Sequence, residues 1–323
     1  MQICGPSLGL KTGTMADTEV DTIKTTEQNW SDLWCRSQDG LNLYARDYGP
    51  RHGRLTPVVC IPGLTRTTRD FHALASHLAS RHRKRRRVLA LDLRGRGKSD
   101  YDRDAGNYSP KREMLDVLDV MVAAGIERAV IVGTSRGGLI AMGMATARPA
   151  ALAGVVLNDI GPRIEAQGLV RIAGQLTRMP RPRNWEEATS LMKRLFKDSF
   201  TDLDDDDWDL FAREIFRDVK GRPRPDFDRK LIRSLSVDKI STTGIPELWH
   251  MFEALAHVPV LAIRGANSDI LIPATLEEMA RRHPDCSTVT IAHRGHAPFL
   301  SEQASISAID EMMNRIDHRT ANS

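Results

Sequence analysis

The stretch that decides the fold spans residues 129–142, AVIVGTSRGGLIAM. An apolar, β-branched run at 130–132 stops at the pentapeptide GTSRG (133–137), and a helix-like run follows at 139–142. The pattern predicts a strand, a tight turn and a helix, with Ser135 at the apex of the turn. Its spacing matches G-x-S-x-G, in which the glycines allow a close backbone approach while the serine hydroxyl is held exposed and strained. The same pentapeptide also occurs by chance around solvent-facing serines. The motif alone therefore does not establish Ser135 as a nucleophile, and other parts of the sequence are needed.

The composition is that of a globular chain in a reducing compartment. Of 323 residues, 41% are hydrophobic, which is enough for a sizeable core. The formal net charge of +4 gives no reason to expect nucleic acid or a membrane as a partner. The four cysteines (Cys4, Cys35, Cys60 and Cys286) are widely scattered and form no C-x-x-C motif. We therefore expect no disulfide and no metal site.

The N-terminal residues 1–28 are expected to form a flexible tail. They are polar and lack the basic start and long apolar run of a signal peptide, and Met15 is an alternative start. No run in the chain reaches the roughly 18 apolar residues that span a bilayer. A cytoplasmic protein is the expectation.

The order of the elements predicts an α/β fold with a mostly parallel sheet and helices on both faces. Continuously apolar strands (57–61, 88–92, 130–132, 153–157, 258–265 and 287–291) alternate with helical segments. A hairpin around Gln38-Asp39-Gly40 adds an antiparallel edge. Residues 162–257 lack a convincing buried strand and read as a helical cap, with helix starts at Asn184, at 204–207 and at Pro246. The core is thus expected at 29–161 and 258–323.

Two charge runs allow two interpretations each. The basic run 81–87 suits a nucleic-acid patch, but no aromatic residues are interleaved with it, which favours a solvated turn. The acidic run 202–209 likewise suits a solvated helix start better than a metal site.

A serine nucleophile needs a base within hydrogen-bond reach and an acid that orients the base. Asp269 follows the strand at 258–265, and His296 follows the strand at 287–291. The carboxyl ends of parallel strands share one edge of the sheet, so these side chains can converge on Ser135. We therefore expect Ser135, Asp269 and His296 to be catalytic. Asp159, after the strand at 153–157, competes for the acid, and His293 competes more weakly for the base.

Acyl transfer also needs two donors aimed at the oxyanion. The backbone N–H of Arg136, directly after the nucleophile, is one expected donor. The N–H of Leu64, in the loop after the strand at 57–61, is the other.

Five motifs in order resemble the α/β-hydrolase superfamily, specifically its lidded, esterase-like branch: CIPGLTRTTRDF (60–71), LALDLRGRGKSD (89–100), GTSRGG (133–138), RGANSD (264–269) and GHAPFL (295–300). The resemblance covers about residues 30–160 and 257–316. It implies the same nucleophile, acid, base and oxyanion donors, and a cap at 162–257. Two departures stand out: Pro62 precedes Gly63 where many members have His, and Arg136 stands where many have Met, Gln or Leu.

Arginines near the expected site raise the question of substrate charge. Arg66, Arg69 and Arg136 all lie in or near loops at that edge, and one of them could bind a substrate carboxylate; structural ion pairs are the favoured alternative. Arg66 and Trp249 are the candidate substrate-binding residues.

The expected activity is hydrolysis of a small carboxylic ester through an acyl-enzyme, without metal or organic cofactor. A carbon–carbon bond hydrolase, a lactonase or a thioesterase would use the same triad, and a non-catalytic ligand receptor is a remote alternative. The resemblance predicts Asp at position 135 for haloalkane or epoxide chemistry, so Ser135 argues against both. A small molecule is the expected partner, with no nucleic acid and no membrane; oligomeric state is left open.

Overall fold

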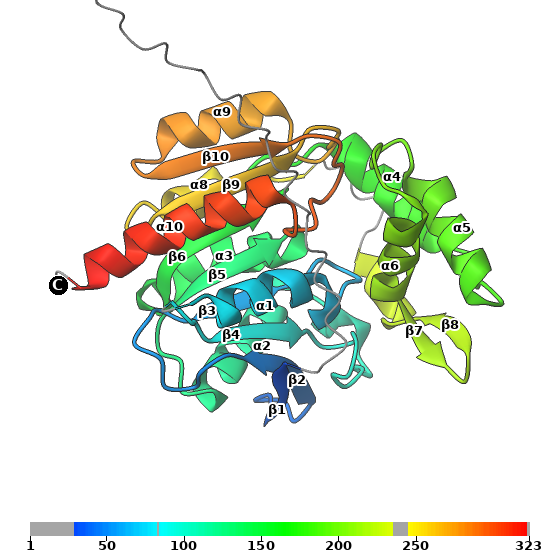
Figure 1. Cartoon of the computed structure of the whole chain (residues 1–323), viewed down its shortest axis with the longest axis horizontal. Helices are drawn as coiled ribbons and strands as arrows, with labels where there is room; N and C mark the ends of the chain where they lie inside the picture. The colour runs from blue at the N-terminus through cyan, green and yellow to red at the C-terminus, as the bar shows by residue number, and fades with distance from the viewer. Residues whose placement is uncertain (1–28, 83, 235–244, 322–323) are drawn as a thin grey trace, which may run out of the picture.

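A single eight-stranded sheet forms the centre of the molecule (Figure 1). The computed structural model describes residues 29–82, 84–234 and 245–321. The predicted tail at 1–28, with Met15, lies outside the described residues. The strands lie in the order β1-β2-β4-β3-β5-β6-β9-β10. Their bounds are β1 Trp30–Arg36, β2 Asn42–Tyr48, β3 Val58–Ile61, β4 Val88–Asp92, β5 Ala129–Thr134, β6 Leu152–Asn158, β9 Val260–Gly265 and β10 Cys286–Ile291.

The pairing of these strands follows from their sequence pattern. From β4 onward the neighbours pair in parallel, and β3, β4, β6 and β9 are buried along their whole length. Apolar side chains on both faces require helices on both faces. The predicted hairpin joins β1 and β2, with Gly40 at φ 90° in its turn. The predicted fold class is confirmed.

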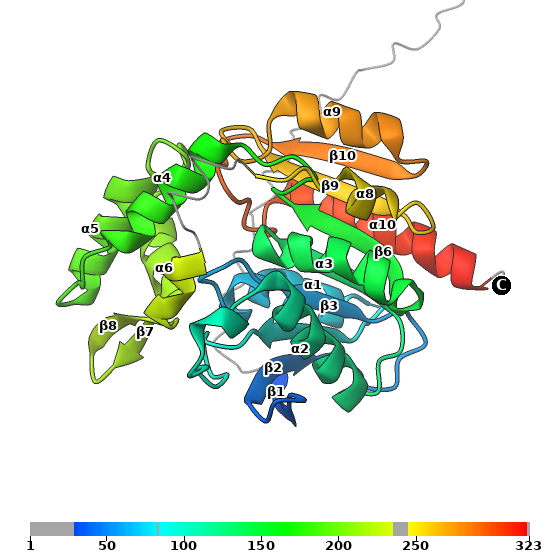
Figure 2. The same cartoon turned by 180° about the vertical axis from the view of Figure 1, so that it is seen from behind.

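Helices cover the sheet on both faces (Figures 1 and 2). On one face, α1 and α10 pack against Val58, Ala90 and Val132. On the other face, α2, α3 and α9 pack against Val59, Ile131 and Leu157. The bounds are α1 His72–Ser80, α2 Pro110–Ala123, α3 Arg136–Ala147, α9 Pro273–Arg282 and α10 Gln303–Ala321.

The segment between β6 and β9 stands beside the carboxyl edge of the sheet (Figure 1). Its elements are α4 Ala166–Thr177, α5 Trp185–Phe196, α6 Asp205–Ile215, β7 Phe216–Val219, β8 Arg222–Pro225, the 3-10 helix η4 Arg229–Ser234 and α8 Trp249–Glu253. Asn184 caps α5 and Asp204 caps α6, at the two helix starts that the sequence predicts; the reciprocal box lies at Asp204 and Asp207 and was not predicted. The β7–β8 hairpin was not predicted.

The last helix of the predicted cap, α8, packs on α3 at the core. Phe252 and Leu255 are fully buried there with the apolar residues of the sheet. This helix therefore belongs, by its contacts, with the core and not with α4–α6.

The basic run 81–87 is engaged with the rest of the molecule. Arg81 pairs with Asp310 and Arg86 with Asp317, both on α10, while Arg87 pairs with Asp47 on β2. Arg86 and Arg87 are buried. Among the residues that the structure describes, no helix is long and apolar enough to cross a bilayer.

Candidate active site

Ser135 lies at a strained turn between β5 and α3. Its φ of 51° and ψ of −110° place it in a region that non-glycine residues rarely adopt. Glycines are needed on both sides: a Cβ on Gly133 would lie 2.5 Å from the backbone of Gly137, and one on Gly137 would lie 2.0 Å from the carbonyl oxygen of Ile61. This close approach lifts the hydroxyl of Ser135 above the carboxyl edge of the sheet.

A continuous hydrogen-bond chain runs from Ser135 through His296 to Asp159. The Nε2 of His296 lies 2.8 Å from the Oγ of Ser135. The Nδ1 of His296 lies 2.8 Å from the Oδ2 of Asp159. Each residue follows the carboxyl end of a different strand: β5, β10 and β6, respectively. This is the nucleophile–base–acid geometry of a serine hydrolase.

Asp159 is fully buried and held on both carboxylate oxygens. The backbone N–H of Gly265 donates to Oδ1 at 2.8 Å, and the hydroxyl of Ser268 donates to Oδ2 at 2.5 Å. Both donors come from the end of β9 and the loop that follows it. That loop therefore supports the acid without supplying it.

The prediction that Asp269 orients His296 is wrong in this structure. Both carboxylate oxygens of Asp269 accept from the guanidinium of Arg171 on α4, at 2.6 and 2.7 Å. This pairing lowers the pKa of the Asp269 carboxyl below its usual value. The side chain is 41% exposed, whereas Asp159 is fully buried against the histidine. Asp269 thus lies in the predicted loop, but its side chain is used to hold α4.

The sequence contained a signal for Asp159. It is the first residue after β6, whereas Asp269 is four residues beyond the end of β9. Because β6 lies directly beside β5 in the sheet, an acid at its end is next to the nucleophile turn. His293, the weaker candidate for the base, is exposed, and its Nδ1 lies 2.9 Å from the hydroxyl of Thr201.

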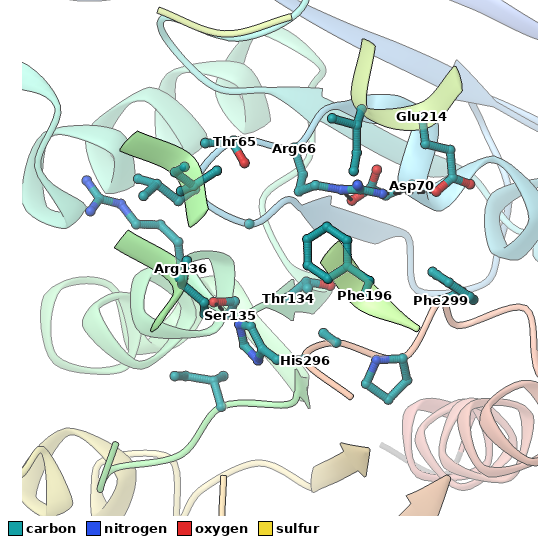
Figure 3. A pocket seen from close by; sticks show the side chains of 18 of the residues that line it. Thr65, Arg66, Asp70, Thr134, Ser135, Arg136, Phe196, Glu214, His296 and Phe299 are labelled. Carbon is teal, nitrogen blue, oxygen red and sulfur yellow. Dashed lines mark hydrogen bonds and ion pairs between the residues drawn. The ribbon is translucent and has the colours of Figure 1, made fainter. Parts of the chain in front are cut away.

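Ser135 and His296 open into a cavity of about 220 Å³ between the sheet edge and the inserted helices (Figure 3). Leu64 and Arg136, the predicted oxyanion donors, both border it. The wall is mainly apolar, formed by aliphatic and aromatic side chains that include Leu139, Ile160, Ile172, Met179, Phe196, Phe200, Phe211 and Phe299.

One end of the cavity carries a charged cluster of Arg66, Asp70 and Glu214 (Figure 3). Arg66 donates to Asp70 at 2.7 Å and to Glu214 of α6 at 2.9 Å. Burial raises the pKa of the Glu214 carboxyl to about 7. The negative charge of Asp70 also raises this pKa, and the positive charge of Arg66 lowers it. The predicted candidate Arg66 therefore lines the cavity, but two carboxylates already share its guanidinium.

The pKa of Glu214 predicts a measurable pH dependence of stability. Its folded value of about 7 exceeds the ordinary value of 4.5, so the folded state holds a proton that the unfolded state has lost between these pH values. The free energy of unfolding of the wild type should therefore fall relative to that of Glu214→Gln as pH rises from about 4.5 to about 7. Urea unfolding across this range tests it. In the exposed control Glu186→Gln, the free energy of unfolding should change with pH as it does in wild type. The same pH dependence in Glu214→Gln as in wild type would contradict the raised pKa of Glu214.

The other arginines and Trp249 have structural partners. Arg136 directs its guanidinium away from Ser135 and His296 (Figure 3) and pairs with Glu113 at 2.6 Å. Arg69 pairs with Asp226 at 2.7 Å. Trp249, the other candidate for contacting substrate, does not border this cavity: it lies on α8 with Arg282 stacked on its ring, and its Nε1 donates to Glu247.

No group of three potential metal-binding side chains occurs within residues 29–82, 84–234 and 245–321.

The chain is similar to known hydrolases. The pattern of the "Alpha/beta hydrolase family" matches residues 58–308. A 3-hydroxybutyrate-oligomer hydrolase of Cupriavidus necator is 32% identical over 280 residues, covering 84% of this chain and 93% of its own. An esterase of Mycobacterium tuberculosis is 30% identical, covering 67% of this chain and 70% of its own. The crystal structure of an alpha/beta hydrolase from Novosphingobium aromaticivorans superposes with a TM-score of 0.80 at 36% identity, covering 90% of this chain and 99% of that one. This chain is an enzyme of the alpha/beta hydrolase family.

Proposed function

We propose that this enzyme hydrolyses carboxylic esters of small molecules through an acyl-enzyme on Ser135. The observation that carries the proposal is the unbroken chain of two 2.8 Å hydrogen bonds from Ser135 through His296 to Asp159, opening into a closed-in apolar cavity. A serine hydroxyl becomes nucleophilic at neutral pH only with such a base, held in one orientation by an acid.

The proposed reaction has two halves. The Oγ of Ser135 attacks the ester carbonyl while the Nε2 of His296 takes its proton, and the resulting oxyanion accepts hydrogen bonds from the N–H groups of Leu64 and Arg136. His296 then gives the proton to the departing alcohol, leaving the acyl group on Ser135. A water activated by His296 releases the acid by the same steps. Asp159 stabilises the imidazolium formed in each half.

The lining of the cavity is complementary to a short acyl group that carries an uncharged polar substituent. Its apolar wall favours a small alkyl chain, while Arg66, Asp70 and Glu214 offer both donors and acceptors to a hydroxyl group. A free carboxylate there would meet two carboxylates sharing one guanidinium. The 3-hydroxybutyrate-oligomer hydrolase from C. necator is named for a substrate of this hydroxyacyl kind. We therefore propose esters of short hydroxy acids as the substrate class, with α4–α6 forming the cap that limits acyl length.

A panel of p-nitrophenyl esters of increasing acyl length, with a lactone, a thioester and a dienoate, tests the reaction class. Ester hydrolysis faster than turnover of the other three supports the proposal. A higher kcat/KM for the lactone, the thioester or the dienoate would contradict ester hydrolysis and indicate a lactonase, a thioesterase or a carbon–carbon bond hydrolase that uses the same triad.

Selectivity for the hydroxyl should depend on Glu214. In wild type we expect a higher kcat/KM for p-nitrophenyl 3-hydroxybutyrate than for p-nitrophenyl butyrate. Glu214→Leu should lower that ratio about tenfold, the cost of one hydrogen bond to a charged or strongly polar partner. The matched control is Glu186→Leu at the exposed start of α5, which should keep the ratio of wild type. Equal kcat/KM for the two esters in wild type would contradict the proposed substrate class.

A further inference from the structure

A buried ion chain begins at the residue that follows the nucleophile. The Nε of Arg136 donates to Glu113 Oε2 at 2.6 Å, and its Nη2 donates to the carbonyl oxygen of Tyr108 at 2.8 Å. Glu113 lies in the first turns of α2, so the start of α3 is tied to α2 directly beneath Ser135.

The same carboxylate is tied to the loop on the other side of the nucleophile. Arg96 Nη1 donates to Glu113 Oε1 at 2.7 Å, and Arg96 Nε donates to the carbonyl oxygen of Leu64 at 2.7 Å. The preceding carbonyl, that of Gly63, accepts from the N–H of Arg66 at 3.3 Å. Both peptide groups that flank the Cα of Leu64 are therefore held. One carboxylate, Glu113, connects Leu64 and Arg136, the two cavity-lining residues that are expected to supply the oxyanion donors.

The chain is charged and almost dry. Arg96 and Glu113 are fully buried, and Arg136 is 9% exposed. Two guanidinium groups face one carboxylate, which leaves one net positive charge beneath the oxyanion position. The opposing charges of Arg96 and Arg136 lower the pKa of Glu113 below its usual value although burial opposes them. A buried ion network of this kind contributes little to stability compared with apolar packing of equal volume. Its position between Leu64 and Arg136 therefore suggests a role in the active site.

We propose that Glu113, through Arg96 and Arg136, is a positioning residue that sets the spacing of the Leu64 and Arg136 oxyanion donors. This rests on the proposed serine-hydrolase function. Such donors act only when both lie within hydrogen-bond distance of the oxyanion, which forms in the transition state and not in the bound ester. A loss of spacing therefore lowers kcat and leaves KM nearly unchanged.

The chain offers a matched control on the same helix. Asp116, one turn after Glu113, is also buried and pairs with the fully buried Arg94 at 2.5 and 2.6 Å. Through the Arg94 guanidinium its contacts continue to Asp39 and Asp102, and Arg94 meets Arg96 through its backbone carbonyl oxygen. Asp116→Asn thus disturbs a comparable buried ion pair without touching the oxyanion donors.

The test compares Glu113→Gln and Asp116→Asn in ester hydrolysis and in binding of a trifluoromethyl ketone, which forms an oxyanion on the serine. Glutamine keeps the shape of Glu113 but accepts from only one of the two arginines. We expect kcat to fall about 10- to 100-fold with KM within about twofold, because both donors remain but are misplaced. The inhibition constant of the ketone should rise by the same factor. Asp116→Asn should leave both quantities near wild type.

Two results would overturn the proposal: a wild-type kcat in folded Glu113→Gln, or the same loss of kcat in both variants, which would indicate general loosening of α2. If circular dichroism shows that Glu113→Gln does not fold, Arg136→Lys is tested by the same two measurements. Lysine keeps the positive charge but cannot donate to Glu113 and to the carbonyl oxygen of Tyr108 at the same time. Failure of the wild type to hydrolyse any ester or bind the ketone would instead refute the proposed function.

Discussion

Asp159→Asn is expected to lower kcat about 10⁴-fold, with KM nearly unchanged. The Nδ1 of His296 faces Asp159 Oδ2 at 2.8 Å, so in wild type this nitrogen carries the proton and Nε2 is free to accept from Ser135. An asparagine amide donates at that position, which forces the proton to Nε2 and removes the base. Steady-state hydrolysis of a p-nitrophenyl ester measures the effect.

The matched control is Asp269→Asn, which changes the other aspartate in the same way. Asp269 is bound by Arg171, so its loss should weaken the attachment of α4 and change kcat less than about tenfold, the ordinary scale for loss of a half-exposed ion pair. A larger loss in Asp269→Asn than in Asp159→Asn would restore Asp269 as the acid and contradict the geometry described above.

Ser135→Ala is expected to lower kcat about 10⁴- to 10⁶-fold, since it removes the group that forms the acyl-enzyme. The thermal midpoint should not fall, because among the residues that the structure describes the hydroxyl hydrogen-bonds to His296 alone, and the strained backbone is fixed by Gly133 and Gly137. The rate of p-nitrophenol release at saturating ester tests this. A variant that retains more than about a hundredth of the wild-type kcat would place the nucleophile elsewhere.

Much of this fold could be predicted because its signals are local. The continuously apolar strands, the glycines around Ser135 and the Gln38-Asp39-Gly40 turn each specify their own conformation. His296 was identified by the same logic, since it follows the last strand of the sheet. The β7–β8 hairpin was missed because its sequence, with Pro223 and Pro225 in one strand, lacks the alternation and β-branched residues by which strands are found.

The place of Asp159 directly after its strand was one signal in the sequence, but the choice between the two acids depends on side-chain direction, which the sequence does not specify. Asp159 and Asp269 both follow buried strands that end at the same edge of the sheet. Only the residue that each side chain contacts distinguishes them. Asp269 meets Arg171 across 98 residues of chain, and Asp159 meets His296 across 137. Such long-range pairings leave no periodic trace in the sequence.

The role of Arg136 was also beyond the sequence. The sequence favoured a structural ion pair for this arginine over a substrate contact but did not indicate its partners, which are the carboxylate of Glu113 and the carbonyl oxygen of Tyr108 in the core. Arg96 lies in the motif at 89–100, but nothing in that motif indicates a contact with Glu113 or with the nucleophile turn. The packing of α2 against α3 brings Glu113 to Arg136, and the loop after β4 brings Arg96 to the same carboxylate.

The central claim is that Ser135, activated by His296 and Asp159, is the nucleophile. The most direct test is labelling with a fluorophosphonate, followed by intact-mass measurement and peptide mapping. We predict one adduct, on Ser135, that is absent in Ser135→Ala, forms slowly in Asp159→Asn and forms at nearly the wild-type rate in Asp269→Asn. An adduct on another residue, or no adduct in the folded wild-type enzyme, would contradict the account.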